Sequence, residues 1–237
     1  MAAVVKLRYA LNFALACEAA NVDPIKLLRG VHIDERMLEN PENMISEHQL
    51  WVLAAQVAQA TGRFDLGREA ARISSVEQHG ALQEVFRHKT LFQRLVTFCE
   101  LAKLEYSRAD FFTLPRWNGL VFGRRRIVGN DEQVRQVELY VLELMFETVR
   151  SVLGPSWQPQ CLNLQSAYHA DLETMVGTDT GKVRFGQPET EIFLGNRGVL
   201  IGARELPVVS TNSHATTDAV SALVHTYLFD PRMTLSF

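Results

Sequence analysis

The sequence contains few of the features that mark a disulfide, zinc or redox protein. Its three cysteines, Cys17, Cys99 and Cys161, are odd in number, lie far apart and form no C-x-x-C pair. This spacing excludes a zinc or thioredoxin-like motif and a disulfide scaffold. We expect three reduced thiols among apolar side chains in a reducing compartment.

The sequence also lacks a long hydrophobic run. A helix that crosses a membrane needs about 18 or more consecutive apolar residues. The most apolar early stretch, residues 4–20, is interrupted by Lys6, Arg8, Asn12 and Glu18, and it does not have the pattern of a signal peptide. We therefore expect a cytoplasmic protein with no membrane partner.

A surplus of positive charge is absent as well. The chain carries 24 Lys+Arg against 27 Asp+Glu, which gives a net charge of -3. Domains that hold nucleic acid by themselves are usually basic or carry a strongly basic patch. The chain is therefore not expected to be a principal DNA-binding surface. Its 237 residues, 47% of them hydrophobic, are typical of one large or two small globular domains.

Helical periodicity dominates the first third of the chain. Ser46 is followed by Gln49 at the spacing of a capping box, and apolar residues then recur at helical spacing over residues 50–58. Gly62 lies where a helix C-cap is expected. The same pattern predicts a helix near residues 7–15 and short helices over 25–28 and 65–73.

The remainder mixes helices and strands without a regular alternation. A helix is predicted from Thr90 to about Tyr106, and the strongest one begins at Asp131 and ends at Gly154. Strands are predicted at 111–114, 120–128 and 161–166, and extended segments at 183–186 and 191–194, with helices at 170–176 and 218–229. This irregular order favours an α+β fold over a wound parallel sheet.

Three regions follow from this pattern. Residues 1–75 are predicted to form an N-terminal helical subdomain. Residues 76–209 are predicted to form a mixed helix and sheet sensor subdomain, and residues 210–237 a linker helix.

Sequence motifs for catalysis, metals or cofactors are missing. None of the seven histidines falls in an H-x-H, H-x-x-x-H or H-E-x-x-H pattern, and no G-x-S-x-G or G-x-G-x-x-G motif occurs. The loop at residues 177–182 lacks the spacing of a phosphate-binding loop. We therefore predict no catalytic residue, no metal site and no cofactor.

The run of three arginines at residues 124–126 is the strongest candidate for ligand recognition. On a strand, Phe122, Arg124 and Arg126 would point to one face. Two guanidinium groups two positions apart could hold a carboxylate or phosphate, with Phe122 beside its apolar body. Alternatively, the arginines mark a solvated strand end and pair with nearby acids, or contact nucleic acid. The predicted ligand-binding residues are Arg124, Arg126, Phe122, Tyr106, Phe86 and His79.

Several segments in a fixed order resemble one protein family. Residues 61–70 resemble its T-G-D-x-x-L-G-L-x-x-A stretch, and residues 80–82 and 89–95 resemble its G-x-L-G-x-A … S-x-T-L-x-x-A-L part. Residues 166–172, 183–186, 191–194 and 204–207 are similar to its later segments. Ala170 and Gly198 depart from the family pattern. The chain thus resembles the N-terminal effector-binding, arabinose-binding-like region of AraC/XylS-type bacterial transcription regulators.

This resemblance implies a sensor that forms a homodimer. In the family, a small molecule binds the N-terminal region and changes DNA binding by a C-terminal pair of helix-turn-helix units. Residues 233–235 look like the first residues of that domain, so we expect that DNA is bound only through a domain missing from this chain. The effector is expected to be a small organic molecule such as an amphipathic acid or a fatty acid.

Two other classes of function remain open from the sequence. Arg124, Arg126, Tyr106 and His169 could converge on a substrate, which would make the protein an enzyme. A stand-alone interaction module or a haem-type sensor is the other alternative, although residues 106–108 do not form the Y-x-S-x-R motif of haem sensors.

Overall fold

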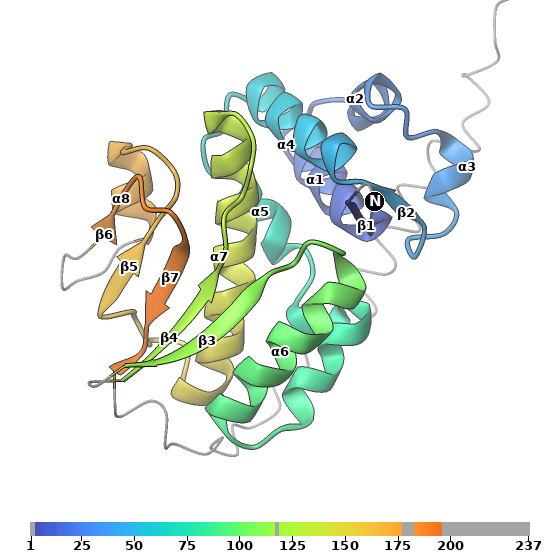
Figure 1. The fold of residues 1–237 in the computed structure, drawn as a ribbon. Helices are drawn as coiled ribbons and strands as arrows, with labels where there is room; N and C mark the ends of the chain where they lie inside the picture. The colour runs from blue at the N-terminus through green and yellow to red at the C-terminus, as the bar shows by residue number, and fades with distance from the viewer. Residues whose placement is uncertain (1–2, 117–118, 177–182, 196–237) are drawn as a thin grey trace, which may run out of the picture.

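The N-terminal third consists of helices held together by a small two-stranded sheet (Figure 1). We analysed a computed structural model, which describes residues 3–116, 119–176 and 183–195. Strand β1 (Val4–Lys6) pairs antiparallel with β2 (Met44–Ser46); the sequence pattern did not predict either strand. The helices of this part are α1 (Leu7–Ala19), α2 (Pro24–Gly30), α3 (Glu35–Leu38), α4 (Glu47–Thr61) and α5 (Leu66–Arg72).

Local capping explains where α4 begins and ends. The Ser46 hydroxyl accepts a hydrogen bond from the Gln49 backbone N–H at 3.2 Å, and the Gln49 side chain accepts from the Ser46 N–H at 2.9 Å. Gly62 closes the helix in the left-handed conformation, with φ of 66°. Both ends were predicted from the sequence and are confirmed, because these signals act within a single turn.

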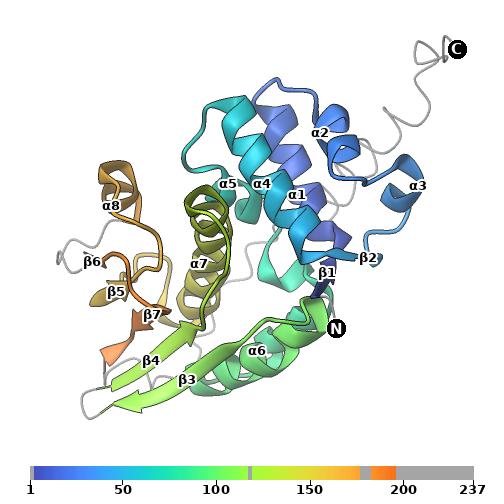
Figure 2. The same cartoon turned by 45° about the horizontal axis from the view of Figure 1, so that its top comes forward.

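Helix α7 (Asp131–Leu153) forms the centre of the molecule. It runs between the sheet and the helices α1, α4 and α5 (Figures 1 and 2). Its contact with α5 is close, because a Cβ atom at Gly67 would lie 2.0 Å from the Gln136 carbonyl oxygen. The Gln136 side chain accepts a hydrogen bond from the Gly67 N–H at 2.7 Å. The glycine thus allows the two helix backbones to meet.

Among the described residues, the larger sheet has five strands in the order β3-β4-β7-β5-β6. Its pairs are antiparallel except for β5 and β6, which run parallel. The strands are β3 (Phe111–Arg116), β4 (Gly119–Arg124), β5 (Cys161–Asn163), β6 (Val183–Arg184) and β7 (Thr190–Phe193). Helix α6 (Leu91–Glu105) lies along the β3–β4 hairpin (Figure 2), after the 3-10 helices η1 (Val76–Gln78) and η2 (Gly80–Arg87), and α8 (Ala170–Val176) follows β5.

Two predicted strands were wrong in length for the same reason. The prediction extended one strand to residue 128, but β4 ends at Arg124, and the Ile127 N–H bonds to the Gln165 side chain at 2.7 Å. The prediction extended another to residue 166, but β5 ends at Asn163. The N–H groups of Gln165 and Ser166 donate to the Glu138 carboxylate of α7, at 2.8 and 2.9 Å. At both strand ends, side chains distant in sequence therefore accept the backbone N–H hydrogen bonds that a neighbouring strand would otherwise accept.

The fold is α+β, as the sequence predicted. The hydrophobic core is continuous from α1 to β7. The division near residue 75 remains a prediction, and the predicted helix at 218–229 in the 210–237 region lies outside the described residues. Within the described ranges, no helix is both long and apolar enough to cross a membrane.

Candidate functional site

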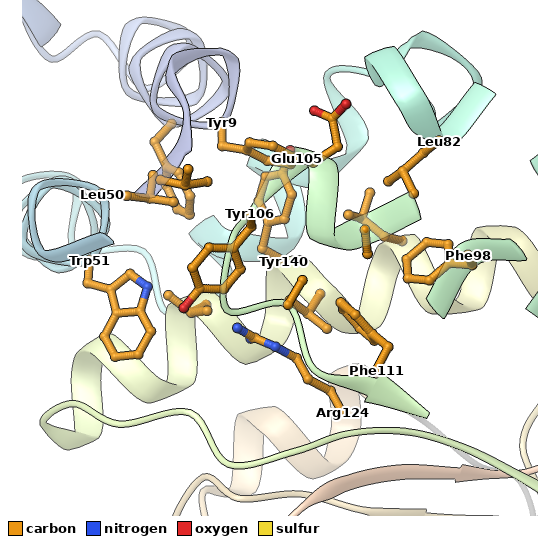
Figure 3. A pocket seen from close by; sticks show the side chains of 17 residues that line it. Tyr9, Leu50, Trp51, Leu82, Phe98, Glu105, Tyr106, Phe111, Arg124 and Tyr140 are labelled. Atoms are coloured by element: carbon orange, nitrogen blue, oxygen red, sulfur yellow. The ribbon is translucent and has the colours of Figure 1, made fainter. Parts of the chain in front are cut away.

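A partly open cavity of about 60 Å³ lies where the N-terminal helices meet α6, α7 and the β3–β4 hairpin (Figure 3). Its walls are almost entirely apolar and aromatic. The lining residues are Val5, Tyr9, Phe13, Leu50, Trp51, Leu82, Phe98, Ala102, Glu105, Tyr106, Ala109, Phe111, Arg124, Val137, Tyr140, Val141 and Leu144. A small apolar cavity with few polar groups is the usual form of a small-molecule site.

Arg124 is the cation of this cavity. It is the last residue of β4 and pairs across the hairpin with Phe111. Its guanidinium carbon lies 5.4 Å from the centre of the Tyr106 ring and 5.7 Å from that of the Phe111 ring. Figure 3 shows the guanidinium pointing toward Tyr106. The side chain is therefore held by cation–π contacts with two aromatic walls.

The charge of Arg124 is poorly compensated. The residue is only 3% exposed, and its Nη1 atom has no hydrogen-bond partner among the described residues. No carboxylate in the described part of the chain lies within ion-pair distance of it. Burial lowers the pKa of Arg124, and Tyr106 and then Glu47 act against that shift. An unpaired buried donor is costly, and Nη1 of Arg124 is such a donor at the cavity wall.

Tyr106 is the most exposed of the residues that line the cavity. It is half-buried, whereas every other lining residue is buried. Its hydroxyl donates a hydrogen bond to Oε1 of Glu47, the first residue of α4. The other oxygen of Glu47 lies 3.5 Å from Nη1 of Arg108. Burial raises the pKa of Tyr106, so the phenol keeps its proton and remains a donor.

The opposite wall is stiffened by a buried polar network around Tyr140. The Asn12 amide donates to the Tyr140 hydroxyl at 2.7 Å. Nδ1 of His79 lies 2.6 Å from the Ser75 carbonyl oxygen and must donate to it, so Nε2 accepts from Tyr140 at 3.1 Å. Burial lowers the pKa of His79 to about 4. The imidazole is thus neutral at pH 7 and supports the wall from behind.

The structure places the six predicted ligand-binding residues in different surroundings. Arg124 and Tyr106 line the cavity. Phe122 and His79 lie behind its walls: Phe122 packs edge-on against Phe98 with ring centres 5.5 Å apart, and His79 contacts Tyr140. Phe86 lies under the guanidinium of Arg94, at 5.2 Å, and does not line the cavity.

Arg126 does not join Arg124, contrary to the expected alternation. Because β4 ends at Arg124, the strand geometry does not continue to Arg126, which is exposed. Arg126 instead lines a separate hollow of about 320 Å³ together with Ile127, Gln165 and Gln187. The structure therefore does not bring the two guanidinium groups into one cavity.

The aromatic walls of the cavity were not predicted from the sequence. Tyr9, Trp51 and Tyr140 lie at ordinary apolar positions of α1, α4 and α7. A core stripe and a cavity wall have the same helical spacing. The available signal was the presence of large aromatic residues with a polar atom at buried positions, which usually need a partner.

The arrangement offers little for catalysis by the residues considered earlier. His169, the fourth residue of the enzyme alternative, stacks on Phe64 with ring centres 4.1 Å apart and does not line the cavity. In the described ranges, no group of three or more His, Cys, Asp or Glu side chains could hold a metal ion. The lining instead suits binding, because one cation, Arg124, and one carboxylate, Glu105, border an otherwise apolar and aromatic space.

Comparisons with known proteins agree with this geometry. The family model for the arabinose-binding N-terminal domain of AraC transcription regulators matches residues 22–198, more than half of the chain. No curated protein matches the chain in a sequence search. The matched residues include all five strands that the structure describes in the larger sheet, and most of the cavity lining, including Arg124 and Tyr106. The chain therefore belongs to the family of N-terminal arabinose-binding domains of AraC transcription regulators and is a ligand-sensing regulatory domain.

Proposed function

We propose that the effector of this domain is a small organic acid whose carboxylate binds Arg124. The observation that carries this proposal is the buried Arg124, which has an unpaired Nη1 atom and no carboxylate partner in the described residues. A ligand carboxylate would supply both the missing acceptor and the missing charge. The apolar part of the ligand would then lie against Phe98, Phe111 and Val141.

The lining favours an acid over a sugar. Each hydroxyl of a pentose needs a hydrogen-bond partner when it leaves water, because an unsatisfied buried polar group costs about 1–3 kcal/mol. The Tyr106 and Tyr140 hydroxyls already have partners in Glu47 and Asn12. Oε1 of Glu105 accepts from the Ala81 N–H, whereas its Oε2 has no hydrogen-bond partner among the described residues and lies 3.7 Å from Nε of Arg8. The lining thus offers few free partners for the several hydroxyls of a pentose. Although the description of the family names arabinose, the lining of this cavity suits an amphipathic acid better than a sugar.

The position of the cavity supports a sensing role rather than an enzymatic one. Its walls come from α1 and α4 on one side and from α6, α7 and the β3–β4 hairpin on the other. A ligand held between them favours one arrangement of these elements over another, to the extent that its affinities for the two differ. We propose that this bias controls a C-terminal helix-turn-helix domain in a cytoplasmic, homodimeric regulator.

Hexanoate and its uncharged counterpart 1-hexanol provide the test. We expect hexanoate to raise the melting temperature of the protein in a concentration-dependent manner, and 1-hexanol to do so much less, because only a bound ligand stabilises the folded state. Acids from acetate to decanoate, and benzoate, extend the series. We expect Arg124→Gln to abolish the stabilisation by hexanoate. Arg126→Gln is the matched control, because Arg126 lies outside the cavity.

Two results would contradict the proposal. Equal stabilisation by 1-hexanol and hexanoate would show that the charge of the ligand is irrelevant. Unchanged binding of hexanoate to Arg124→Gln would show that the acid binds elsewhere.

A further inference from the structure

The cavity is too small in this state for most organic acids. Its volume is about 60 Å³, whereas an apolar cavity that accepts benzene has a volume of about 150 Å³. An acid with more than a few non-hydrogen atoms can therefore be fully enclosed only when part of the wall moves.

Tyr106 is the part of the wall that can move most easily. Among the lining residues it alone is half-buried, and it follows directly after the end of α6. Buried walls such as Phe98 and Tyr140 are fixed by the core and, for Tyr140, by hydrogen bonds. Tyr106 is fixed at its tip by one acceptor, the Glu47 carboxylate, and its ring covers the guanidinium of Arg124.

We propose that Tyr106 and Glu47 form a latch over Arg124, and that an anionic ligand opens it by taking the Tyr106 hydroxyl hydrogen bond away from Glu47. This proposal rests on the proposed function, because the ligand must carry a carboxylate. In the closed state the hydroxyl donates to Glu47; in the bound state it donates to the ligand, which Arg124 also holds.

The exchange is chemically balanced. The Glu47 carboxylate and a ligand carboxylate are equivalent acceptors, so the hydroxyl loses one charge-assisted hydrogen bond and gains another. No proton changes its owner, because burial keeps the phenol of Tyr106 protonated. Glu47 retains Arg108 as a partner at 3.5 Å, so its charge is not left alone. The net gain comes from Arg124, whose Nη1 atom finds an acceptor.

The latch also has a position from which it can transmit the binding event. Glu47 is the first residue of α4, and Tyr106 lies at the corner between α6 and β3. Their hydrogen bond ties α4 to this corner across 59 positions of sequence. When the ligand takes the hydroxyl, this tie is lost, while the bridge between Val5 and Tyr106 still holds β1 in place. Binding therefore removes one of the two side-chain contacts of Glu47 with this corner and leaves its ion pair with Arg108.

A double-mutant cycle with hexanoate tests the latch. Glu47→Gln replaces a charged acceptor by a neutral one and weakens the closed state, so we expect hexanoate to bind about fivefold more tightly. Tyr106→Phe removes the hydroxyl that donates to Glu47 in the closed state and to the ligand in the bound state. Its own effect on the affinity for hexanoate is therefore expected to be small. In the double variant, we expect Glu47→Gln to have lost most of its effect on affinity. Isothermal titration with hexanoate measures all four affinities.

Arg108→Gln is the matched control, because it removes the other partner of Glu47 and leaves the latch intact. It is expected not to tighten binding. If Glu47→Gln raises the affinity equally with and without Tyr106→Phe, Glu47 acts only through its charge and the latch is wrong. In that case the proposed function still stands, provided that Arg124→Gln abolishes binding. If hexanoate does not bind the unaltered protein, or binds Arg124→Gln equally well, both proposals are overturned.

Discussion

Two neighbouring arginines at the end of β4 occupy opposite environments. Arg124 turns into the protein, is 3% exposed and has no ion pair among the described residues. Arg125 turns outward, with 57% of its side chain exposed, and pairs with Glu189 at 2.8 Å and Asp110 at 3.4 Å. Arg125, the paired arginine, corresponds to a solvated strand end, which is one of the three interpretations that the sequence left open. The unpaired one is the candidate site. A charge that the protein itself leaves uncompensated is thus more informative than a run of charges.

Replacement of Arg124 by methionine gives the sharpest test of this contrast. Arg124→Met removes a buried charge and keeps a side chain of related shape, so we expect the free energy of unfolding to rise by about 1–3 kcal/mol. The same change should weaken hexanoate binding about 100-fold, because the anchor is lost. Urea unfolding and titration with hexanoate measure the two quantities on one protein.

The stability and the hexanoate affinity of Arg124→Met together test the contrast between Arg124 and Arg125. A more stable protein that no longer binds would identify Arg124 as a residue kept for function at the expense of stability. A less stable protein would mean that the contacts of Arg124 with Tyr106 and Phe111 hold the fold together, and would break the contrast with Arg125.

A half-buried acid, Glu147, extends the comparison to α7. Both oxygens of Glu147 accept from the Val76 N–H, at 2.9 and 3.0 Å, and burial raises the pKa of Glu147 to about 7. The folded protein therefore keeps this proton between pH 4.5 and 7, while the unfolded chain loses it. Consequently, this group makes the free energy of unfolding fall as the pH rises through that window.

We expect Glu147→Gln to remove this fall. Its stability relative to the unaltered protein should rise between pH 4.5 and 7, by on the order of 2 kcal/mol, and stay constant above pH 8. Urea unfolding at a series of pH values measures the difference. A difference that does not change with pH would show that Glu147 is no more strained by burial than a surface acid.

The smallest effect is expected at Arg125. Exposed ion pairs contribute about 0–1 kcal/mol, so Arg125→Gln should lower the free energy of unfolding by less than about 1 kcal/mol. The loss should shrink further in high salt, which screens exposed charges. Hexanoate binding should be unchanged. A loss as large as the effect at Arg124 would contradict the division into a paired outer and an unpaired inner arginine.

The sequence was sufficient for features that depend on a few neighbouring residues. Ser46 and Gln49 cap α4, and Gly62 ends it, because each acts within one helical turn. The α+β class followed from the order of such elements. Strand ends were harder to predict, because β4 and β5 end where Gln165 and Glu138 from elsewhere capture the backbone.

The candidate site was predictable only in part. The arginine run pointed to Arg124, and Tyr106 was named as a possible partner, yet the sequence could not separate Arg124 from Arg126. That separation depends on the end of β4 and on the packing of the hairpin against α6. The aromatic residues Tyr9, Trp51 and Tyr140 were hidden among core positions, because helical spacing shows which face is buried and not whether it is filled.

The close crossing of α5 and α7 has a consequence for evolution. Because a Cβ atom at Gly67 would overlap the Gln136 carbonyl oxygen, a mutation to any other residue must push the two helices apart. Relatives that keep this crossing are therefore expected to carry glycine at the equivalent position, whatever effector they recognise. Gly67 can serve as a fixed reference point when distant members of the family are aligned, even where the residues around the cavity have diverged.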